Sequence, residues 1–257
     1  MGTALVTGAS SGIGEAFARQ LAARGHDLVV VARRADRLAA LAESVTRSHG
    51  RVVEVLEADL TDPAGLGRVT QRCADPERPL DLLVNNAGHG TLGRFWELPR
   101  AGETASVALN VTALVECTHA ALGPMVARGS GGVINVSSLG AYQPLPLNAT
   151  YGATKAFVSS FTNSLAEELR GTGVRAMVVA PGFTRTEFQA ESFSPGNVPG
   201  FVWQSADAVA AAALRAYERG RVVCITGVVN VVTAAASSVM PAAVTRRVTG
   251  AVTRRIY

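Results

Sequence analysis

The chain has 257 residues, of which 48% are hydrophobic and 17% charged, and its formal net charge is +4. This composition allows a sizeable core, and the mild charge forms no basic stripe interleaved with aromatic residues, which argues against nucleic-acid binding. Three widely spaced cysteines argue against a disulfide framework and favour a reduced, cytoplasmic compartment; no signal peptide or metal-ligand spacing is expected.

Apolar runs alternate with helix-period segments along the chain. Strands are predicted at 4–7, 28–32, 52–57, 80–85, 132–137, 174–180 and 221–225. Helices are predicted at 12–24, 36–48, 63–73, 103–127, 151–170 and 206–219. This alternation predicts a parallel sheet covered by helices on both faces, within one domain spanning residues 1–257.

The first predicted strand runs into a glycine-rich turn, Thr7–Gly14, within which a helix begins. Glycines permit a tight turn and let a phosphate approach the backbone, and a helix N-terminus offers free N–H groups. An ordinary strand-to-helix turn is the simpler alternative. The strand before it and the helix after it favour a dinucleotide site.

The second predicted strand ends in Ala32, Arg33 and Arg34. NAD-binding folds place an acidic residue near this point to hold the ribose hydroxyls, and none stands here. Two guanidiniums suit the 2′-phosphate of NADP(H), although they could also simply begin the next helix in water. We therefore expect NADP(H) rather than NAD(H) as the cofactor.

Polar residues also follow the later predicted strands, at the edge where ligands bind in open α/β sheets. The third strand is followed by Asp59 and Leu60, of which Asp59 could equally cap a helix. The fourth is followed by the turn Asn85–Gly88, and the fifth ends in Ser137 and Ser138. A ligand site at this edge is therefore expected.

Tyr151 and Lys155 lie at the start of the fifth predicted helix, one turn apart. Residues four apart share a helix face, so the ammonium can lower the pKa of Tyr151 and let it exchange a proton near neutral pH. The same spacing also occurs by chance on many solvated helices. Asn110, within the preceding long apolar helix, marks either a local hydrogen-bond network or a function.

Taken together, these stretches resemble the short-chain dehydrogenase/reductase family over nearly the whole chain. The motifs that match in order and separation are Thr7–Gly14, Asp59-Leu60, Asn85–Gly88, Asn110, Ser138, Tyr151 with Lys155, and Pro181-Gly182. The resemblance implies a Rossmann-like three-layer αβα fold with a seven-stranded parallel sheet, order 3-2-1-4-5-6-7. It also implies hydride transfer between a nicotinamide and a carbonyl or alcohol carbon, EC class 1.1.1.

The resemblance implies residue roles as well. Tyr151 would exchange the proton, and Lys155 would lower its pKa and hold the nicotinamide ribose. Ser138 would bond the substrate oxygen, and Asn110 would hold a water. Besides Tyr151 and Lys155, the implied NADP(H)-binding residues are Gly8, Ser10, Ser11, Gly12, Ile13, Gly14, Arg33, Arg34, Asp59, Leu60, Asn86, Ala87, Gly88, Pro181, Gly182, Thr184 and Thr186.

The segment 183–204 resembles the family's substrate lid. Its aromatic residues favour a hydrophobic carbonyl or alcohol substrate: Phe188, Phe193, Phe201 and Trp203. Trp203 could instead only anchor the following helix. His89 could line the pocket or lie at the surface, and Arg185 has no assigned role.

Residues 222–245 are uncharged and long enough to span a bilayer, but their Gly, Asn, Ser, Thr and Pro residues favour a buried strand followed by one or two apolar helices. The arginine pairs 246–247 and 254–255 could touch a membrane surface or be solvated. The apolar segment 227–257 could serve hydrophobic substrates or an oligomer interface. The family's usual assembly implies a homodimer or homotetramer.

An enzyme is favoured over a non-catalytic NADP(H)-binding sensor or scaffold on the same fold, because the implied catalytic set Asn110, Ser138, Tyr151 and Lys155 is complete. A hydrolase is a third alternative, but none of the four histidines lies near a plausible nucleophile motif in the sequence.

Overall fold

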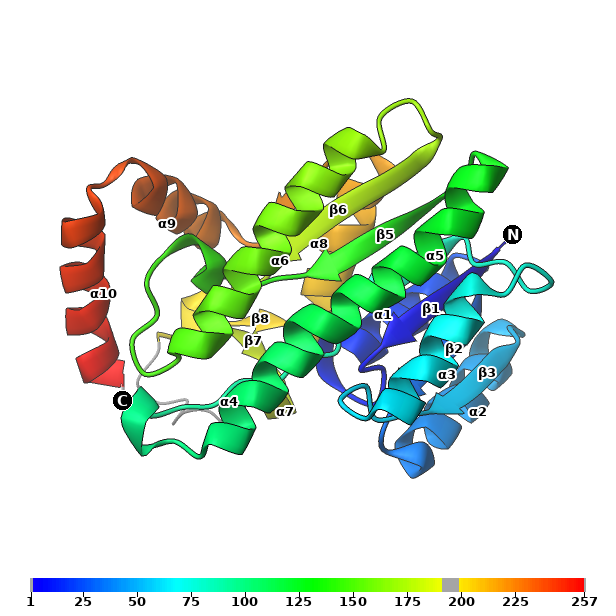
Figure 1. Ribbon diagram of the computed structural model, residues 1–257, viewed down its shortest axis with the longest axis horizontal. Helices are drawn as coiled ribbons and strands as arrows, with labels where there is room; N and C mark the ends of the chain where they lie inside the picture. Colours follow the sequence, from blue (N-terminus) through cyan, green and yellow to red (C-terminus); the bar gives the residue numbers. More distant parts are fainter. Residues whose placement is uncertain (1, 191–198, 257) are drawn as a thin grey trace.

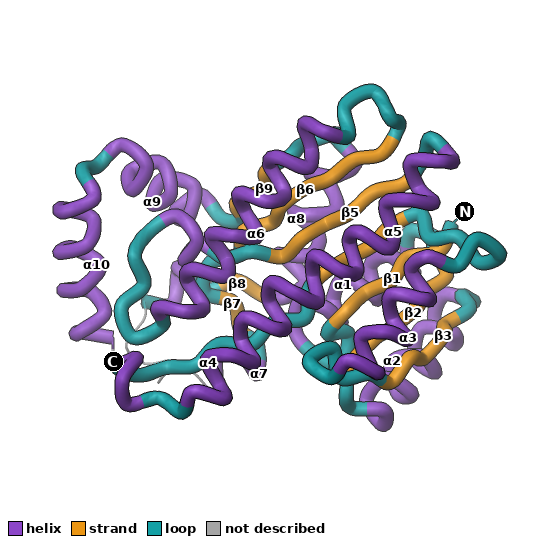
Figure 2. Tube along the Cα trace, viewed as in Figure 1, coloured by secondary structure: helices purple, strands orange, loops and turns teal. Residues whose placement is uncertain are grey.

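The computed structural model describes residues 2–190 and 199–256. Its middle layer is a seven-stranded parallel sheet in the order β3-β2-β1-β4-β5-β6-β9, with helices on both faces (Figures 1 and 2). The predicted fold class and strand order are confirmed. The seventh strand of the sheet carries the label β9 because β7 (Thr184–Arg185) and β8 (Gln204–Ser205) form a separate small pair.

The five inner strands are short, apolar and mostly buried, as expected for a sheet covered on both faces. The edge strands β3 and β9 are partly exposed, so the strand predicted at the start of 222–245 is not buried as expected. Their bounds are β1 (Thr3–Thr7), β2 (Asp27–Ala32), β3 (Val53–Glu57), β4 (Leu82–Asn85), β5 (Gly131–Val136), β6 (Val174–Ala180) and β9 (Val223–Ile225). Alternate residues serve opposite layers, so that Val6 packs on one face of β1 and Leu5 on the other.

Each face of the sheet is covered by three helices. One layer consists of α1 (Gly12–Ala23), α2 (Ala35–His49) and α8 (Ala206–Glu218). The other layer consists of α3 (Pro63–Ala74), α5 (Leu114–Arg128) and α6 (Ala149–Glu168). These helices agree with the predicted ones to within a few residues, except for the long helix predicted at 103–127.

That long helix is divided into α4 (Arg100–Val107), a π-helical segment (Ala108–Ala113) and α5. By length and composition the continuous stretch Arg100–Arg128 could cross a membrane. Its buried side chains, such as Cys117 and Met125, instead pack in one core cluster with side chains of α3 and of the sheet. The stretch therefore serves the core of this fold.

The uncharged stretch 222–245 forms no continuous helix. It contains β9, α9 (Val228–Val239) and the start of α10 (Ala242–Ile256), with Pro241 between the two helices. In Figure 1, α9 and α10 project from one end of the sheet. Valines of both helices are exposed, including Val232 at 63% and Val248 at 48%.

A row of buried polar side chains runs from α5 to α6 over one face of the sheet, through β4 and β5. The Asn85 amide nitrogen donates to Thr118 Oγ1 and to Asn135 Oδ1, each at 2.9 Å. Asn135 Nδ2 donates in turn to Thr162 Oγ1 at 3.0 Å, and Thr162 Oγ1 donates to the Val158 carbonyl at 2.7 Å. These groups are therefore satisfied by one another and by the backbone.

Candidate active site

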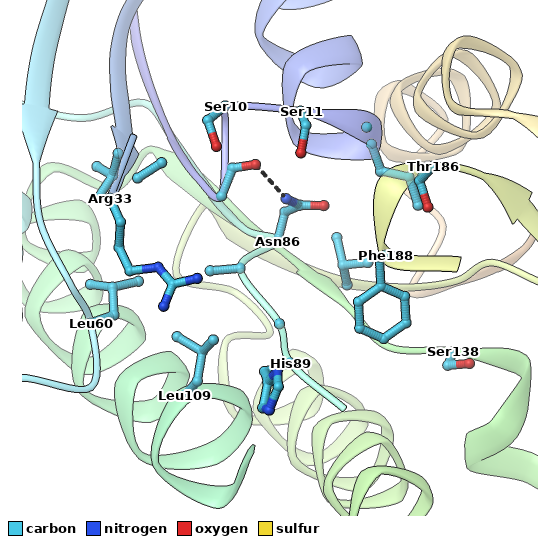
Figure 3. Close-up of a pocket in the computed structure, with 18 of the residues that line it drawn as sticks. Ser10, Ser11, Arg33, Leu60, Asn86, His89, Leu109, Ser138, Thr186 and Phe188 are labelled. Carbon is cyan, nitrogen blue, oxygen red and sulfur yellow. Dashed lines mark hydrogen bonds between the residues drawn. The ribbon is translucent and has the colours of Figure 1, made fainter. Parts of the chain in front are cut away.

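A pocket of about 430 Å³ opens at the carboxyl ends of the central strands (Figure 3). The structure brings into its lining every predicted cofactor-binding residue except Gly14, and also Ser138. Asn110 lies behind the wall. Lining residues that the sequence did not assign are Val31, Ala32, Ala58, Thr61, Ala105, Leu109, Val136, Ser137 and Gln189.

The glycine-rich turn between β1 and α1 forms one wall of the pocket. Gly8 and Gly12 adopt left-handed backbone angles, with φ of 65° and 59°. A Cβ on Gly8 would lie 2.9 Å from the Ala87 backbone. Because the first N–H groups of a helix have no partner within it, the start of α1 offers donors for a phosphate here.

Gly14 supports this turn from behind. A Cβ at this position would lie 2.3 Å from the Gly8 carbonyl oxygen, so only glycine lets α1 pack this closely on the turn. Asn86 also acts on the turn: its Nδ2 donates to the carbonyls of Thr7 at 2.9 Å and Gly8 at 3.3 Å (Figure 3). Thr7 Oγ1 accepts the N–H groups of Asn86 and Ala87, each at 3.0 Å, a role the sequence did not reveal.

Arginine and serine side chains gather at the end of the pocket beside β2. Arg34 Nη2 donates to Ser10 Oγ at 3.0 Å and to Ser11 Oγ at 2.8 Å. The Arg33 side chain is 78% exposed and reaches into the pocket beside Leu60, with Nη1 3.9 Å from Asp59 Oδ2 (Figure 3). Two cations and two hydroxyls thus converge on one rim.

Asp59 does not cap α3, because Asp62 accepts the Gly65 N–H at 2.8 Å and does so instead. Asp59 Oδ1 accepts the hydroxyl and the N–H of Thr61, at 2.7 Å and 2.8 Å. These bonds, chiefly the one from the hydroxyl, lower the pKa of Asp59. It is therefore a fixed, ionised group on the pocket wall.

Tyr151, Lys155 and Ser138 meet at the opposite end of the pocket. Lys155 is 3% exposed and its Nζ donates to the Val136 carbonyl at 2.8 Å. Burial lowers the pKa of Lys155 to about 8. Tyr151 is partly buried on the same helix face, 5.7 Å from Nζ to the ring centroid.

The expected lowering of the tyrosine pKa by Lys155 is wrong for the protein alone. Burial raises the pKa of Tyr151, and a hydrogen bond with Ser138 opposes this only partly. The physical reason is that the lysine ammonium bonds to the backbone of β5, so desolvation of the phenol dominates. The protein alone therefore keeps Tyr151 protonated at neutral pH.

The two serines that end β5 have different partners. Ser137 Oγ donates to the Lys155 carbonyl at 2.7 Å and lies 2.8 Å from Ser159 Oγ, which ties β5 to α6. Ser138 Oγ accepts the Gly140 N–H at 3.1 Å and faces the pocket (Figure 3). Of the two, Ser138 presents its hydroxyl to the pocket, whereas the hydroxyl of Ser137 bonds between β5 and α6.

Asn110 occupies the π-helical segment and takes part in a local network. Its Oδ1 accepts the His89 N–H at 2.9 Å, and its Nδ2 donates to the His89 carbonyl at 2.7 Å and to Thr154 Oγ1 at 3.0 Å. Thr154 Oγ1 donates to the Tyr151 carbonyl at 2.8 Å. Asn110 thus joins the loop after β4 to the helix that carries Tyr151.

The segment after Pro181 covers the pocket from the α1 side. Thr184 and Thr186 line it, and Arg185 between them is exposed to solvent. In α7 (Glu187–Ala190), the Phe188 ring points into the pocket and lies 5.6 Å from the Tyr151 ring (Figure 3). Phe188 therefore brings apolar surface to the pocket beside Tyr151.

Other predicted aromatic residues of this segment lie elsewhere. Trp203 packs against Phe183, with ring centroids 5.6 Å apart, and does not line the pocket. Phe201 is 78% exposed, and Phe193 lies outside the described residues. His89, for which two placements were open, lines the pocket. Among residues 2–190 and 199–256, no group of His, Cys, Asp or Glu could hold a metal ion.

The sequence profile of the family described as short chain dehydrogenase matches residues 2–197. The chain belongs to this family. This short-chain dehydrogenase is 41% identical over 209 residues to an uncharacterized oxidoreductase of Myxococcus xanthus, covering 80% of each chain. It is therefore an oxidoreductase of that family, with a nicotinamide-binding fold.

Two solved structures are similar to this short-chain dehydrogenase over nearly its full length. The first is a short-chain dehydrogenase from Sphingobium yanoikuyae in complex with NADPH, with 35% identity, a TM-score of 0.84, and 94% and 97% coverage of the two chains. The second is the bulky-bulky ketone specific alcohol dehydrogenase of Comamonas testosteroni, with 30% identity, a TM-score of 0.80, and 94% and 95% coverage.

Proposed function

We propose that this protein is an NADP(H)-dependent oxidoreductase that transfers a hydride between the nicotinamide and a carbonyl or secondary alcohol carbon of a hydrophobic substrate. The observation that carries the proposal is that the two ends of the pocket differ in chemistry. Arg33 and Arg34 stand at one end, and Tyr151 with Ser138 stands at the other. The whole chain, residues 1–257, works as one dinucleotide-binding catalytic domain.

The residues of the pocket suit NADP(H). The cradle at Gly8 has no room for a side chain, which fits a backbone approached by a pyrophosphate beside the start of α1. Arg33 and Arg34 would bind the 2′-phosphate with charge-assisted hydrogen bonds, next to the Ser10 hydroxyl. The NADPH complex of the Sphingobium yanoikuyae relative supports the same cofactor here.

The residues at the other end would handle the proton and the substrate oxygen. When bound, the nicotinamide supplies or accepts the hydride. In reduction, Ser138 would hydrogen-bond the carbonyl oxygen and Tyr151 would give it a proton as the hydride reaches the carbon. In oxidation, Tyr151 would take the proton back, with the Lys155 ammonium favouring the phenolate once the site is closed to water.

A hydrophobic carbonyl compound fits the space beside Tyr151. Phe188 brings apolar surface to the pocket, with its ring 5.6 Å from the ring of the proton donor Tyr151. The Comamonas testosteroni relative is described as specific for bulky-bulky ketones, which supports this substrate class.

We also propose a homodimer or homotetramer in the cytoplasm. On α6, Phe157 is 40% exposed and stacks on Phe161 at 5.8 Å between ring centroids, which offers an apolar helix face for a second copy. Cys73, Cys117 and Cys224 are free thiols, which suits a reducing compartment. Light scattering after size-exclusion chromatography tests the assembly directly.

The proposed activity is tested by following NADPH oxidation against a panel of ketones, aldehydes and β-keto esters. NADH and the Tyr151→Phe variant run alongside. We expect turnover with NADPH, little with NADH, and a loss of about 10²–10⁴-fold in Tyr151→Phe. Tight NADPH binding without turnover of any compound, in the wild type, would instead favour a non-catalytic sensor.

A further inference from the structure

The carboxylate of Glu187 lies beside the end of the pocket that holds Arg33 and Arg34. Glu187, the first residue of α7, bridges two guanidiniums, that of Arg34 just before α2 and that of Arg37 in its first turn. Its Oε2 lies 2.8 Å from Arg34 Nη1 and its Oε1 lies 2.5 Å from Arg37 Nη1. These arginines hold the pKa of Glu187 at about 2, so it is ionised at any working pH.

The bond to Glu187 completes the set of partners around Arg34. Its Nε and Nη2 donate to Ser10 Oγ and its Nη2 also donates to Ser11 Oγ, while Nη1 donates to Glu187. Four of the five N–H donors of the guanidinium are therefore engaged before any cofactor binds, and the fifth is the second N–H of Nη1. A phosphate that binds Arg34 with a pair of N–H groups must take at least one of the four occupied places.

Of the partners of Arg34, Glu187 is the one a phosphate would displace. The serine hydroxyls are neutral and can rotate to donate to a phosphate oxygen. The carboxylate is anionic and would repel a dianionic phosphate bound to the same guanidinium. Arg37 does not line the pocket, so Glu187 can stay bound to Arg37 when it leaves Arg34.

We propose that Glu187 is a cofactor-discriminating residue: its carboxylate occupies Arg34 in the empty protein and competes with the 2′-phosphate of NADP(H) for that guanidinium. The proposal rests on the proposed NADP(H) function. Glu187 weakens the binding of a 2′-phosphorylated adenosine and leaves the binding of an unphosphorylated one unchanged. It thereby lowers the ratio of NADP(H) affinity to NAD(H) affinity that the two arginines create.

The test is calorimetric titration with two probes that occupy only the adenosine end, adenosine 2′,5′-bisphosphate and adenosine 5′-monophosphate. The variant is Glu187→Gln. The control is Glu43→Gln, which removes an equal charge from an exposed ion pair of α2 away from the pocket. Since exposed ion pairs are individually weak, we expect Glu187→Gln to bind the bisphosphate roughly three- to tenfold more tightly. The monophosphate should bind equally in all three proteins.

Competition at Arg34 is separated from a general charge effect by repeating the comparison in an Arg34→Gln background. There the gain from Glu187→Gln should disappear, while Arg33 still allows measurable binding. A gain that persists, or an equal gain for the monophosphate, would overturn competition for this guanidinium. If the wild type prefers the bisphosphate but Glu187→Gln changes nothing, the competition alone is wrong. If the wild type shows no such preference, the NADP(H) assignment fails too.

Discussion

Lys155 carries its charge in a buried position, and it is the single lysine of the chain. Burial lowers its pKa to about 8, whereas an unfolded chain keeps the lysine proton up to about 10.4. Between these values the unfolded state binds more protons than the folded state. The contribution of Lys155 to the free energy of unfolding therefore rises with pH across this window, by up to about 3 kcal/mol.

We therefore expect the lysine ε-carbon signal to titrate near pH 8 in the folded, cofactor-free protein. Protein labelled with ¹³C-lysine gives one such signal for NMR, because no other lysine is present. In urea unfolding of the Lys155→Met variant, the rise in the free energy of unfolding between pH 8 and pH 10 should be absent. A titration midpoint at or above 10 would show that the ammonium is not desolvated.

Asn110 is expected to matter for stability as well as for the site. Replacing this buried residue with alanine removes the acceptor of the His89 N–H and the donor to the His89 carbonyl and Thr154, which costs about 1–3 kcal/mol in the free energy of unfolding. Urea unfolding measures this loss. Asn163→Ala on α6, an exposed asparagine, is the control and should change stability by less than about 0.5 kcal/mol. Equal effects of the two variants would contradict the network at Asn110.

At the scale of elements, the contact between α1 and the glycine-rich turn decides whether the pocket can form. Gly14→Ala places a Cβ 2.3 Å from the Gly8 backbone oxygen, so α1 must move away from the turn. We expect a loss of about 1–3 kcal/mol in the free energy of unfolding and weaker binding of NADPH.

The chain offers a matched control in another helix. A Cβ on Gly67 of α3 would meet nothing within 4 Å, so Gly67→Ala should stabilise the protein by up to about 1 kcal/mol through helix propensity alone. Thermal unfolding and NADPH titration of both variants make the comparison. Gly14→Ala with unchanged binding would mean that the turn tolerates a shift of α1.

The elements also show what the sequence could and could not predict. The strands were predictable because β1 and β6 are covered on both faces and so read as apolar runs. The π-helical segment was not, because it depends on bonds between Asn110 and the distant His89. The pair β7 and β8 has two residues in each strand, too few to give a periodic pattern.

The same limit applies within the site. Motif spacing placed Ser138 and Tyr151 in one pocket, since the ends of parallel strands share an edge. The pKa of Tyr151 depends on how deeply the fold buries it, which spacing does not encode. Glu187 meets Arg34 across 153 positions of sequence, so no local pattern announces the contact.

For the whole molecule, α10 is expected to add little to the stability of the sheet. Val244 and Val248 remain 45% and 48% exposed, although Thr245 is buried. A chain ending at Met240 should unfold in urea within about 1 kcal/mol of the full chain, because little apolar area is lost. Leu214→Ala, which empties a buried site of α8, should cost about 2–5 kcal/mol by comparison.

Light scattering of the shortened chain, beside the full chain, shows in addition whether the exposed valines hold copies together. A fall in stability of the size seen for Leu214→Ala would mean that α10 is part of the core.

The row of polar side chains from Thr118 through Asn85 and Asn135 to Thr162 also governs how the sheet can assemble. If β4 slid by one residue against β5, Asn85 would turn to the opposite layer, among the apolar residues of α1 and α8. Its amide and that of Asn135 would then lose their partners. The row therefore fixes the register of β4 against β5. A folding chain that pairs these strands in a shifted register forms a less stable sheet and can return to the native register.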